Sequence, residues 1–196
     1  MKNNLWPYLT PGIADEMFIR GKIPMTKEEI RVITLAKARP APDQIFWDIG
    51  AGTGSLSIEA ARLILNGTVY AIEKNPAGLE LIVQNTRRFG LDNVVPVAGE
   101  APSVLRELPS PHRVLIGGSG GRLAEILEYV IKRIMPGGRI VINAVTLETV
   151  ARLIVPPQGW RCEIVQLQVS RSVPAGQVHM WRGLNPVCII TLERKQ

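Results

Sequence analysis

Residues 48–55 read Asp-Ile-Gly-Ala-Gly-Thr-Gly-Ser, and they constrain the fold of this chain more than any other segment. They follow the apolar residues 45–47, so the pattern predicts a buried strand that runs into a glycine loop and then into a helix. Because glycine has no Cβ, alternate glycines permit a sharp turn and let the backbone approach a ligand. In an open parallel α/β sheet, ligands bind beyond the carboxyl ends of the strands. The segment therefore predicts an α/β fold with a ligand site at this loop.

The spacing of the glycines indicates the kind of ligand. A dinucleotide loop reads G-x-G-x-x-G; its third glycine would fall on Ser55, whereas this chain has glycine at Gly54. The pattern acidic-x-Gly-x-Gly-x-Gly resembles the first motif of class I S-adenosylmethionine-dependent methyltransferases. Asp48, two residues before the loop, suits a sulfonium ligand with an amino-acid tail. A second predicted strand, residues 68–72, ends at Glu73, whose carboxylate can accept hydrogen bonds from both ribose hydroxyls. Dehydrogenases use the same device, so Glu73 alone does not discriminate.

Length and charge bound the remaining possibilities. A chain of 196 residues is expected to form one domain. Its net charge of +6 favours an acidic partner, which leaves nucleic acid, an anionic membrane and a small polycarboxylate open. Aromatic residues make up only 5% of the chain, which argues against a base-stacking surface. No apolar run approaches the roughly 20 residues needed to span a bilayer, so we expect a cytoplasmic protein without membrane contact.

The two cysteines also favour a cytosolic protein. Cys162 and Cys188 both fall in predicted strands, and we expect them to be reduced core residues, as in a cytosolic protein. Neither forms a metal-ligand spacing with His112 or His179, so no metal site is predicted.

Strands and helices alternate along the chain, which is typical of a parallel sheet wrapped by helices. Residues 1–25 are expected to form a loop-rich arm that contributes to the active site, and residues 26–196 a single domain. Thr26 and Glu29 form a capping box that predicts a helix to about residue 38. Gly67 is expected to cap the helix after the glycine loop. The predicted strands are 44–49, 68–72, 93–97, 113–116 and 139–144; the further helices are 54–66, 76–89, 122–135 and 146–154. An antiparallel pair, 161–169 and 185–192, closes the sheet, with a long connection at 170–184. This order predicts a doubly wound, Rossmann-like α/β sheet, mostly parallel with a closing antiparallel hairpin, and it resembles the fold of class I methyltransferases.

Several further segments resemble one branch of that superfamily. They are residues 8–13, 24–29, 99–102, 117–121 and 185–187, in addition to the glycine loop. Together they are similar to the decarboxylating precorrin methyltransferases of cobalamin biosynthesis, and the similarity covers nearly the whole chain. The resemblance implies methyl transfer from S-adenosylmethionine to carbon 15 of a precorrin or cobalt-precorrin, decarboxylation of an acetate side chain, and a homotetramer. An overall basic protein suits this polycarboxylate tetrapyrrole.

The same resemblance assigns roles to residues. Thr26 is expected to approach the cofactor, although as a lone residue it is more typical of a helix cap. The residues expected to hold S-adenosylmethionine are Thr26, Asp48, Gly50, Ala51, Gly52, Thr53, Gly54, Ser55, Glu73, Gly99, Glu100 and Ala101. Thr53 and Ser55 are placed to donate to its carboxylate at a helix N-terminus. Glu73 is expected to hold the ribose, with residues 99–101 beside the adenine.

The methyl acceptor is expected at the end of the fourth strand. Gly117, Gly118, Ser119 and Gly120 lie there, and their small side chains would admit a flat macrocycle. Arg171, His179 and Arg182, in the connection 170–184, are expected to cover the substrate and pair with its carboxylates. No catalytic acid or base is assigned, because placement of the two reactants accounts for methyl transfer to an enamine-like carbon. Two alternatives stay open: a methyltransferase for RNA or ribosomal protein, and a non-catalytic nucleotide-binding module.

Overall fold

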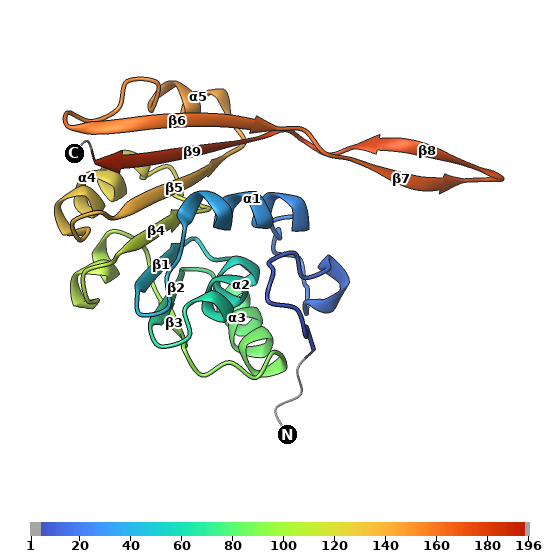
Figure 1. Cartoon of the computed structure of the whole chain (residues 1–196), viewed down its shortest axis with the longest axis horizontal. Helices are drawn as coiled ribbons and strands as arrows, with labels where there is room; N and C mark the ends of the chain where they lie inside the picture. The colour runs from blue at the N-terminus through green and yellow to red at the C-terminus, as the bar shows by residue number, and fades with distance from the viewer. Residues whose placement is uncertain (1–4, 195–196) are drawn as a thin grey trace.

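The strands form one large sheet and a separate two-stranded hairpin in residues 5–194, the part of the chain that the computed structural model describes (Figure 1). The large sheet has seven strands in the order β3-β2-β1-β4-β5-β9-β6. Five are parallel: β1 (Ile45–Ile49), β2 (Thr68–Glu73), β3 (Val94–Ala98), β4 (Arg113–Ile116) and β5 (Arg139–Ala144). Strand β9 (Val187–Arg194) pairs antiparallel with both β5 and β6 (Trp160–Leu167). The predicted fold class is confirmed.

Helices cover both faces of the sheet because the strand side chains alternate between them. Phe46 packs with α1 (Glu28–Ala38), α2 (Ser55–Leu63) and α3 (Pro76–Arg88) on one face. Trp47, the next residue, packs on the other face with α4 (Leu123–Arg133), the 3₁₀ helix η2 (Ser103–Glu107) and the segment around α5 (Leu147–Ala151). The strand order reverses between β1 and β4. That reversal opens a crevice at the carboxyl ends of the strands, which is where ligands bind in such folds.

The N-terminal arm lies on the face covered by α1, α2 and α3. It contains one short 3₁₀ helix, η1 (Asp15–Met17), and buries the side chains of Ile13 and Phe18 in the core. Side chains of the helices bind its backbone: Arg62 donates to the Trp6 carbonyl, and Asn85 both donates to and accepts from the backbone of residue 19. The first four residues of the predicted arm lie outside the described part of the chain.

Arg31 on α1 anchors this arm through a buried cluster of charges, which we call the arm cluster (Asp15, Arg31 and Glu59). Arg31 is fully buried, with its Nε 2.7 Å from Glu59 Oε1 and its Nη1 2.7 Å from Asp15 Oδ1. It also donates to the carbonyls of Ile13 and Thr26. Glu59 in turn accepts from the Gly12 amide. The cluster therefore joins the arm to α1 and α2.

Two predicted helix caps are wrong. Helix α1 begins at Glu28 after Lys27, whose side chain makes no capping hydrogen bond. The Glu28 amide donates to Asp15 Oδ1 of the arm instead. The predicted capping partner Glu29 instead pairs with Arg171, 142 residues away along the chain. Helix α2 ends at Leu63 with Ile64 as its C-cap, so Gly67 is not a cap. A Cβ at Gly67 would overlap the Gln44 carbonyl, and this close approach explains the glycine.

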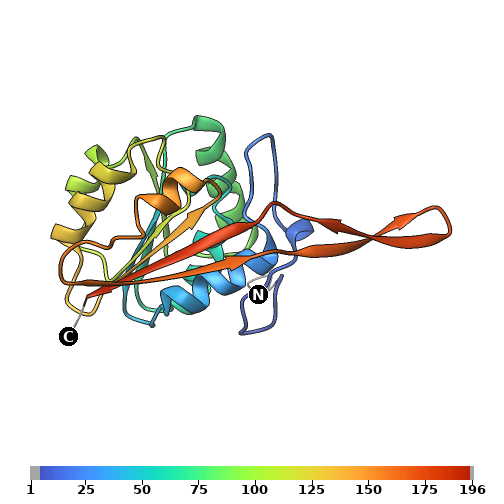
Figure 2. The ribbon, with the colours of Figure 1, turned by 90° about the horizontal axis from the view of Figure 1, so that it is seen from above.

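The predicted connection 170–184 is itself a hairpin of two strands, β7 (Ser170–Ala175) and β8 (Val178–Gly183). It extends away from the body of the molecule in both views (Figures 1 and 2). The two cysteines are free, as expected, but both are half-buried rather than core residues.

Candidate active site

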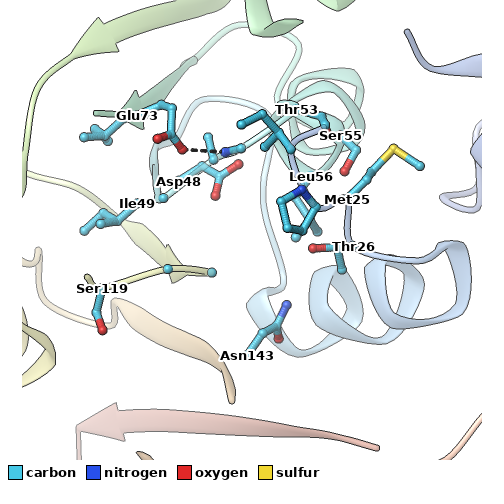
Figure 3. Close-up of a pocket in the computed structure, with 18 of the residues that line it drawn as sticks. Met25, Thr26, Asp48, Ile49, Thr53, Ser55, Leu56, Glu73, Ser119 and Asn143 are labelled. Atoms are coloured by element: carbon cyan, nitrogen blue, oxygen red, sulfur yellow. Dashed lines mark hydrogen bonds between the residues drawn. The ribbon is translucent and has the colours of Figure 1, made fainter. Parts of the chain in front are cut away.

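A pocket of about 690 Å³ opens at the carboxyl ends of the parallel strands (Figure 3). One side is formed by the loops after β1, β2 and β3, and the other by the ends of β4, β5 and β9. The arm closes it from a third side with residues 23–27, which lead into α1. The pocket is therefore built from segments spread over most of the chain.

The two glycine loops touch at the floor of this pocket. Gly50 has φ of +72°, and an added Cβ would overlap the backbone of Gly118 in the loop after β4. Gly52 has φ of +58°, and its Cβ would lie 3.3 Å from the Pro24 carbonyl of the arm. Both positions combine a left-handed backbone with close neighbours, so glycine is required there.

Glu73 is fixed by backbone amides at the end of β2. Its Oε2 accepts from Gly52 N and its Oε1 from Asn75 N, each at 2.8 Å. These bonds hold the carboxylate against the glycine loop and along the pocket wall. A carboxylate held in this way can accept further hydrogen bonds from a vicinal diol, since each oxygen has a free lone pair.

Asp48 lies beneath the loop with 1% of its surface exposed. Burial raises its pKa to about 6, an effect to which the nearby charge of Glu73 adds and which the hydrogen bond from the Ser57 hydroxyl opposes. This buried carboxyl lines the pocket close to where a cationic ligand would neutralise it.

Thr53 begins the turn into α2 and is almost fully buried, with 1% exposed. Its hydroxyl lines the pocket and has no hydrogen-bond partner among residues 5–194. Ser55, the first residue of α2, lies beside it in the pocket wall. An unpartnered hydroxyl next to the free amides of a helix start fits the carboxylate of an amino-acid ligand. With the glycine cradle and Glu73, these residues fit S-adenosylmethionine.

A chain of ion pairs crosses the rim of the pocket at the end of β3. Lys74 Nζ lies 2.8 Å from Glu100 Oε1, and Arg122 Nη1 lies 3.3 Å from Glu100 Oε2. The hydrogen bond from Lys74, with the charges of Lys74 and Arg122, holds the pKa of Glu100 below its usual range. Glu100 is thus an anion beside Ala101 and Gly99, where the adenine is expected.

Most of the predicted site residues meet in this one pocket. Those that line it are Thr26, Asp48, Gly50, Ala51, Gly52, Thr53, Ser55, Glu73, Gly99, Glu100, Ala101, Gly117, Gly118, Ser119 and Gly120. Gly54 does not line it: at φ of +76° its Cβ would lie 3.0 Å from Ile82 on α3, so this glycine serves helix packing.

The three predicted residues of the connection 170–184 lie outside the pocket. Arg171 forms ion pairs with Glu29 and Asp15 at the base of the hairpin, and these pairs occupy its guanidinium. His179 and Arg182 are exposed on β8. Arg182 pairs across the hairpin with Arg171 at its base, and His179 pairs with Pro174 further along it. Within one chain, therefore, the structure does not bring these residues to the substrate.

Other lining residues were missed from the sequence. Lys27 follows the predicted Thr26, and Asn143 lies on β5. The segments around β6 and β9 contribute Val169, Leu184, Asn185 and Val187. Lys27, Asn185 and Val187 lie in segments that carry the family resemblance, but no role was predicted for them. No motif indicates Asn143, Val169 or Leu184, because strands that are distant in the sequence bring them to the pocket. No cluster of histidine, cysteine or acidic residues that could hold a metal occurs in the described part of the chain.

The fold and the pocket define a class I methyltransferase. The sequence model of the precorrin methyltransferase domain matches residues 16–194, and the chain belongs to this family.

Relatives of high coverage carry more specific names. A probable cobalt-precorrin-6B C(15)-methyltransferase (decarboxylating) of Pyrobaculum calidifontis is 41% identical over 95% of this chain and 97% of its own length. The Salmonella typhi cobalt-precorrin-6B C(15)-methyltransferase (decarboxylating) is 37% identical over 94% and 97%.

Solved structures agree with these relatives. The precorrin-6Y C5,15-methyltransferase structure of Geobacter metallireducens superposes with a TM-score of 0.90 at 41% identity, covering 95% of this chain and all of that one. A tRNA (m1A58) methyltransferase of Aquifex aeolicus, at 16% identity and a TM-score of 0.75, shares the fold alone. Family membership thus decides against the RNA methyltransferase and the non-catalytic module. No helix in residues 5–194 is long and apolar enough to cross a membrane.

Proposed function

We propose that this chain transfers a methyl group from S-adenosylmethionine to carbon 15 of a precorrin or cobalt-precorrin and decarboxylates an acetate side chain of the macrocycle, which leaves a methyl group on the ring and releases carbon dioxide. The observation that carries the proposal is the pocket itself. It joins a glycine cradle, a carboxylate at the end of β2 and an open region over β4, β5 and β9. The relatives that share the whole chain are named for this reaction.

The chain's contribution is to bind and align the two reactants. Bound S-adenosylmethionine supplies an electrophilic methyl group. Glu73 holds the ribose, Thr53 and Ser55 hold the carboxylate of the amino-acid tail, and Glu100 borders the adenine. The loop 117–120 lets the macrocycle approach because its residues carry little or no side chain. Good alignment of this kind supplies effective molarities of roughly 10⁵ M or more, so no strong protein base is required.

Charge at the open side of the pocket suits an acidic substrate. Only two cations line the pocket within residues 5–194, Lys27 and Lys74, and Lys74 is bound to Glu100. Lys27 lies at the start of α1, with 39% of its side chain exposed and its Nζ 3.7 Å from Asp15. Its ammonium can therefore meet a peripheral carboxylate of the tetrapyrrole.

The proposal includes assembly as a homotetramer, for which the hairpin β7–β8 offers a surface. Val178, Met180 and Trp181 on β8 are 61%, 60% and 77% exposed. An isolated two-stranded hairpin is marginally stable in water, so an apolar one is expected to pack against another chain. Trp181→Glu is expected to lower the mass measured by light scattering. Leu65→Glu, at a comparably exposed site outside the hairpin, serves as the control.

The cytoplasm is the proposed compartment. Both cysteines are free in the described part of the chain, as is usual where thiols are kept reduced.

A reconstituted assay tests the reaction. The purified chain is incubated with labelled S-adenosylmethionine and the cobalt-bearing or cobalt-free tetrapyrrole precursor. Mass spectrometry should show one methyl gained and one carbon dioxide lost. Total RNA in a parallel incubation should stay unlabelled. Labelled RNA, or a tetrapyrrole recovered unchanged, would contradict the proposal.

A further inference from the structure

Asn143 has a polar side chain in the half of the pocket that is expected to hold the methyl acceptor. Neither the sequence motifs nor the names of the relatives assign it a role. It is the one residue of β5 that is not fully buried. It follows the core strand residues 139–142, and asparagine is disfavoured inside strands. In Figure 3 its side chain points into the pocket, on the side opposite Glu73.

The position of Asn143 separates it from the cofactor. Apart from Thr26 of the arm, the groups expected to hold S-adenosylmethionine follow β1, β2 and β3, which occupy one side of the sheet. Asn143 lies on β5, two strands beyond β1, beside β9. Around it, Ile30, Val145 and Val187 line the pocket with apolar surface. Asn143 is therefore a directional polar group in a largely apolar acceptor region.

One half of the Asn143 amide is fixed by α1. Thr34 is fully buried, and its hydroxyl lies 3.1 Å from Asn143 Oδ1 and 2.7 Å from the Ile30 carbonyl. The single hydroxyl proton is shared between these two oxygens, an arrangement common in helices. This contact holds Oδ1 toward α1, so the amide nitrogen is directed the other way.

The other half of the amide has no partner. Asn143 Nδ2 is buried, and no group in residues 5–194 accepts a hydrogen bond from it. A buried donor without an acceptor destabilises the folded chain, so such groups are rare away from functional sites. Thr34 would remain satisfied by the Ile30 carbonyl without Asn143, so the amide is not needed for the core. Its free N–H is available to a ligand.

We infer that Asn143 is a substrate-binding residue whose Nδ2 donates a hydrogen bond to a carboxylate oxygen of the tetrapyrrole, with Thr34 as its positioning residue. This inference rests on the proposed function for the identity of the substrate. The donor is neutral and held on a strand, whereas Lys27, just before α1, supplies a positive charge to the same pocket. The two together would fix the macrocycle in one orientation relative to the glycine loop.

The test compares Asn143→Leu, which keeps the branching and the number of heavy atoms of the side chain, with Asn143→Asp, which keeps an acceptor and loses the donor. With cobalt-precorrin-6B, Asn143→Leu should lower kcat/KM by about 10- to 100-fold, as expected for one hydrogen bond to a charged group. Asn143→Asp should lose more, because it opposes one carboxylate with another. Affinity for S-adenosylhomocysteine, measured by calorimetry, should stay at the wild-type value for both.

Stability separates this role from a structural one. The melting temperature of Asn143→Leu should equal or exceed that of the wild type, because the variant removes an unsatisfied donor. Thr191→Val is the matched control: its buried hydroxyl on β9 is also unpartnered among the described residues but does not line the pocket. It should keep both stability and activity. Thr34→Val should lower kcat/KM in the wild type and have no further effect in the Asn143→Leu background.

Each other outcome overturns the inference in a recognisable way. If Asn143→Leu has a lower melting temperature than the wild type, the role of Asn143 is structural. If the variant keeps the wild-type kcat/KM, Asn143 does not bind the substrate. Asn143→Asp as active as the wild type makes the amide oxygen the contact atom rather than the nitrogen. A wild type and a Thr191→Val variant that both leave cobalt-precorrin-6B and its cobalt-free counterpart unchanged refute the proposed function, and the inference about its substrate with it.

Discussion

The arm cluster and the pocket both bury polar groups, but they treat them in opposite ways. In the arm cluster, every guanidinium nitrogen of Arg31 has a partner, and both carboxylates face it. In the pocket, the hydroxyl of Thr53 and the amide nitrogen of Asn143 have no partner within residues 5–194, and Asp48 faces no cation that the structure records. Satisfied groups hold the structure together, whereas unsatisfied ones lower its stability, a cost that a ligand can offset for those that line the pocket.

The largest effect is expected in the arm cluster. Arg31→Met leaves Asp15 and Glu59 buried without their cation, so it should lower the free energy of unfolding by about 3–5 kcal/mol. Urea denaturation measures it. Lys132→Ala removes an ion pair with Glu128 in which both side chains are about 70% exposed, and it should have little effect. If Arg31→Met is as stable as Lys132→Ala, the buried arm cluster contributes no more to stability than an exposed ion pair.

Asp48 should give a pH dependence of stability. Its folded pKa of about 6 exceeds the ordinary value of 3.8, so the folded chain keeps the proton that the unfolded chain releases. The stability from this group is complete below pH 3.8 and is lost as the pH rises through about 6. Asp48→Asn cannot ionise, so its free energy of unfolding should rise relative to the wild type by about 2 kcal/mol between pH 4 and pH 7.

Asp15 should show the opposite sign. Burial would raise its pKa, but the hydrogen bond and charge of Arg31, with the charges of Lys27 and Arg171, bring it below the ordinary value. Its contribution is therefore present above the unfolded pKa and is lost as the pH falls through the folded one. Denaturation curves of Asp48→Asn and Asp15→Asn at several pH values should diverge in opposite directions. Parallel curves would refute the distinction.

Gly50→Ala tests the pocket floor. Its Cβ would overlap the Gly118 backbone at φ of +72°, so affinity for S-adenosylhomocysteine should fall by about 10- to 100-fold. Gly90→Ala is the matched control, since Gly90 has φ of +63° with nothing within 4 Å of the added atom. It carries the same backbone strain but should bind normally in calorimetry. Equal losses in both variants would assign the effect to strain rather than to the close approach.

Arg171→Gln should have the smallest effect. Arg171 joins the base of the hairpin to Asp15 and Glu29, but 37% of its side chain is exposed. We expect a loss of about 1 kcal/mol or less, as for other exposed ion pairs. Amide exchange should accelerate in β7 and β8, and Arg182→Gln on the exposed part of β8 should leave it unchanged. If Arg171→Gln lowers the free energy of unfolding as much as Arg31→Met does, Arg171 of the hairpin is an energetic part of the arm cluster.

Local patterns predicted the elements that carry the cofactor side of the site. The glycine loop, Glu73 and the residues after β3 each follow a strand whose apolar run is readable, and the parallel order brings the strand ends together. The hairpin was missed because Pro174 disfavours a strand. Gly176 and Gln177 between alternating residues were nevertheless a turn signal.

Long-range contacts explain the remaining differences. Glu29 reads as a capping residue, yet Arg171 offers it a charged partner that no local pattern reveals. Asn143 reads as an interruption in an apolar strand, and its partner Thr34 lies 109 residues earlier. The arm cluster likewise joins residues 15, 31 and 59, so its members look like unrelated surface charges until the arm has packed.

Strand β9 lies between β5 and β6, so β6 has no hydrogen-bonded link to the rest of the large sheet except through β9. The residues just before and within β9, Leu184, Asn185 and Val187, are also part of the acceptor wall. One strand thus fastens an outer strand to the sheet, carries the base of the hairpin and borders the substrate. If a neighbouring chain or heat moved the hairpin, the wall that borders the methyl acceptor would shift before the wall that borders the nucleoside.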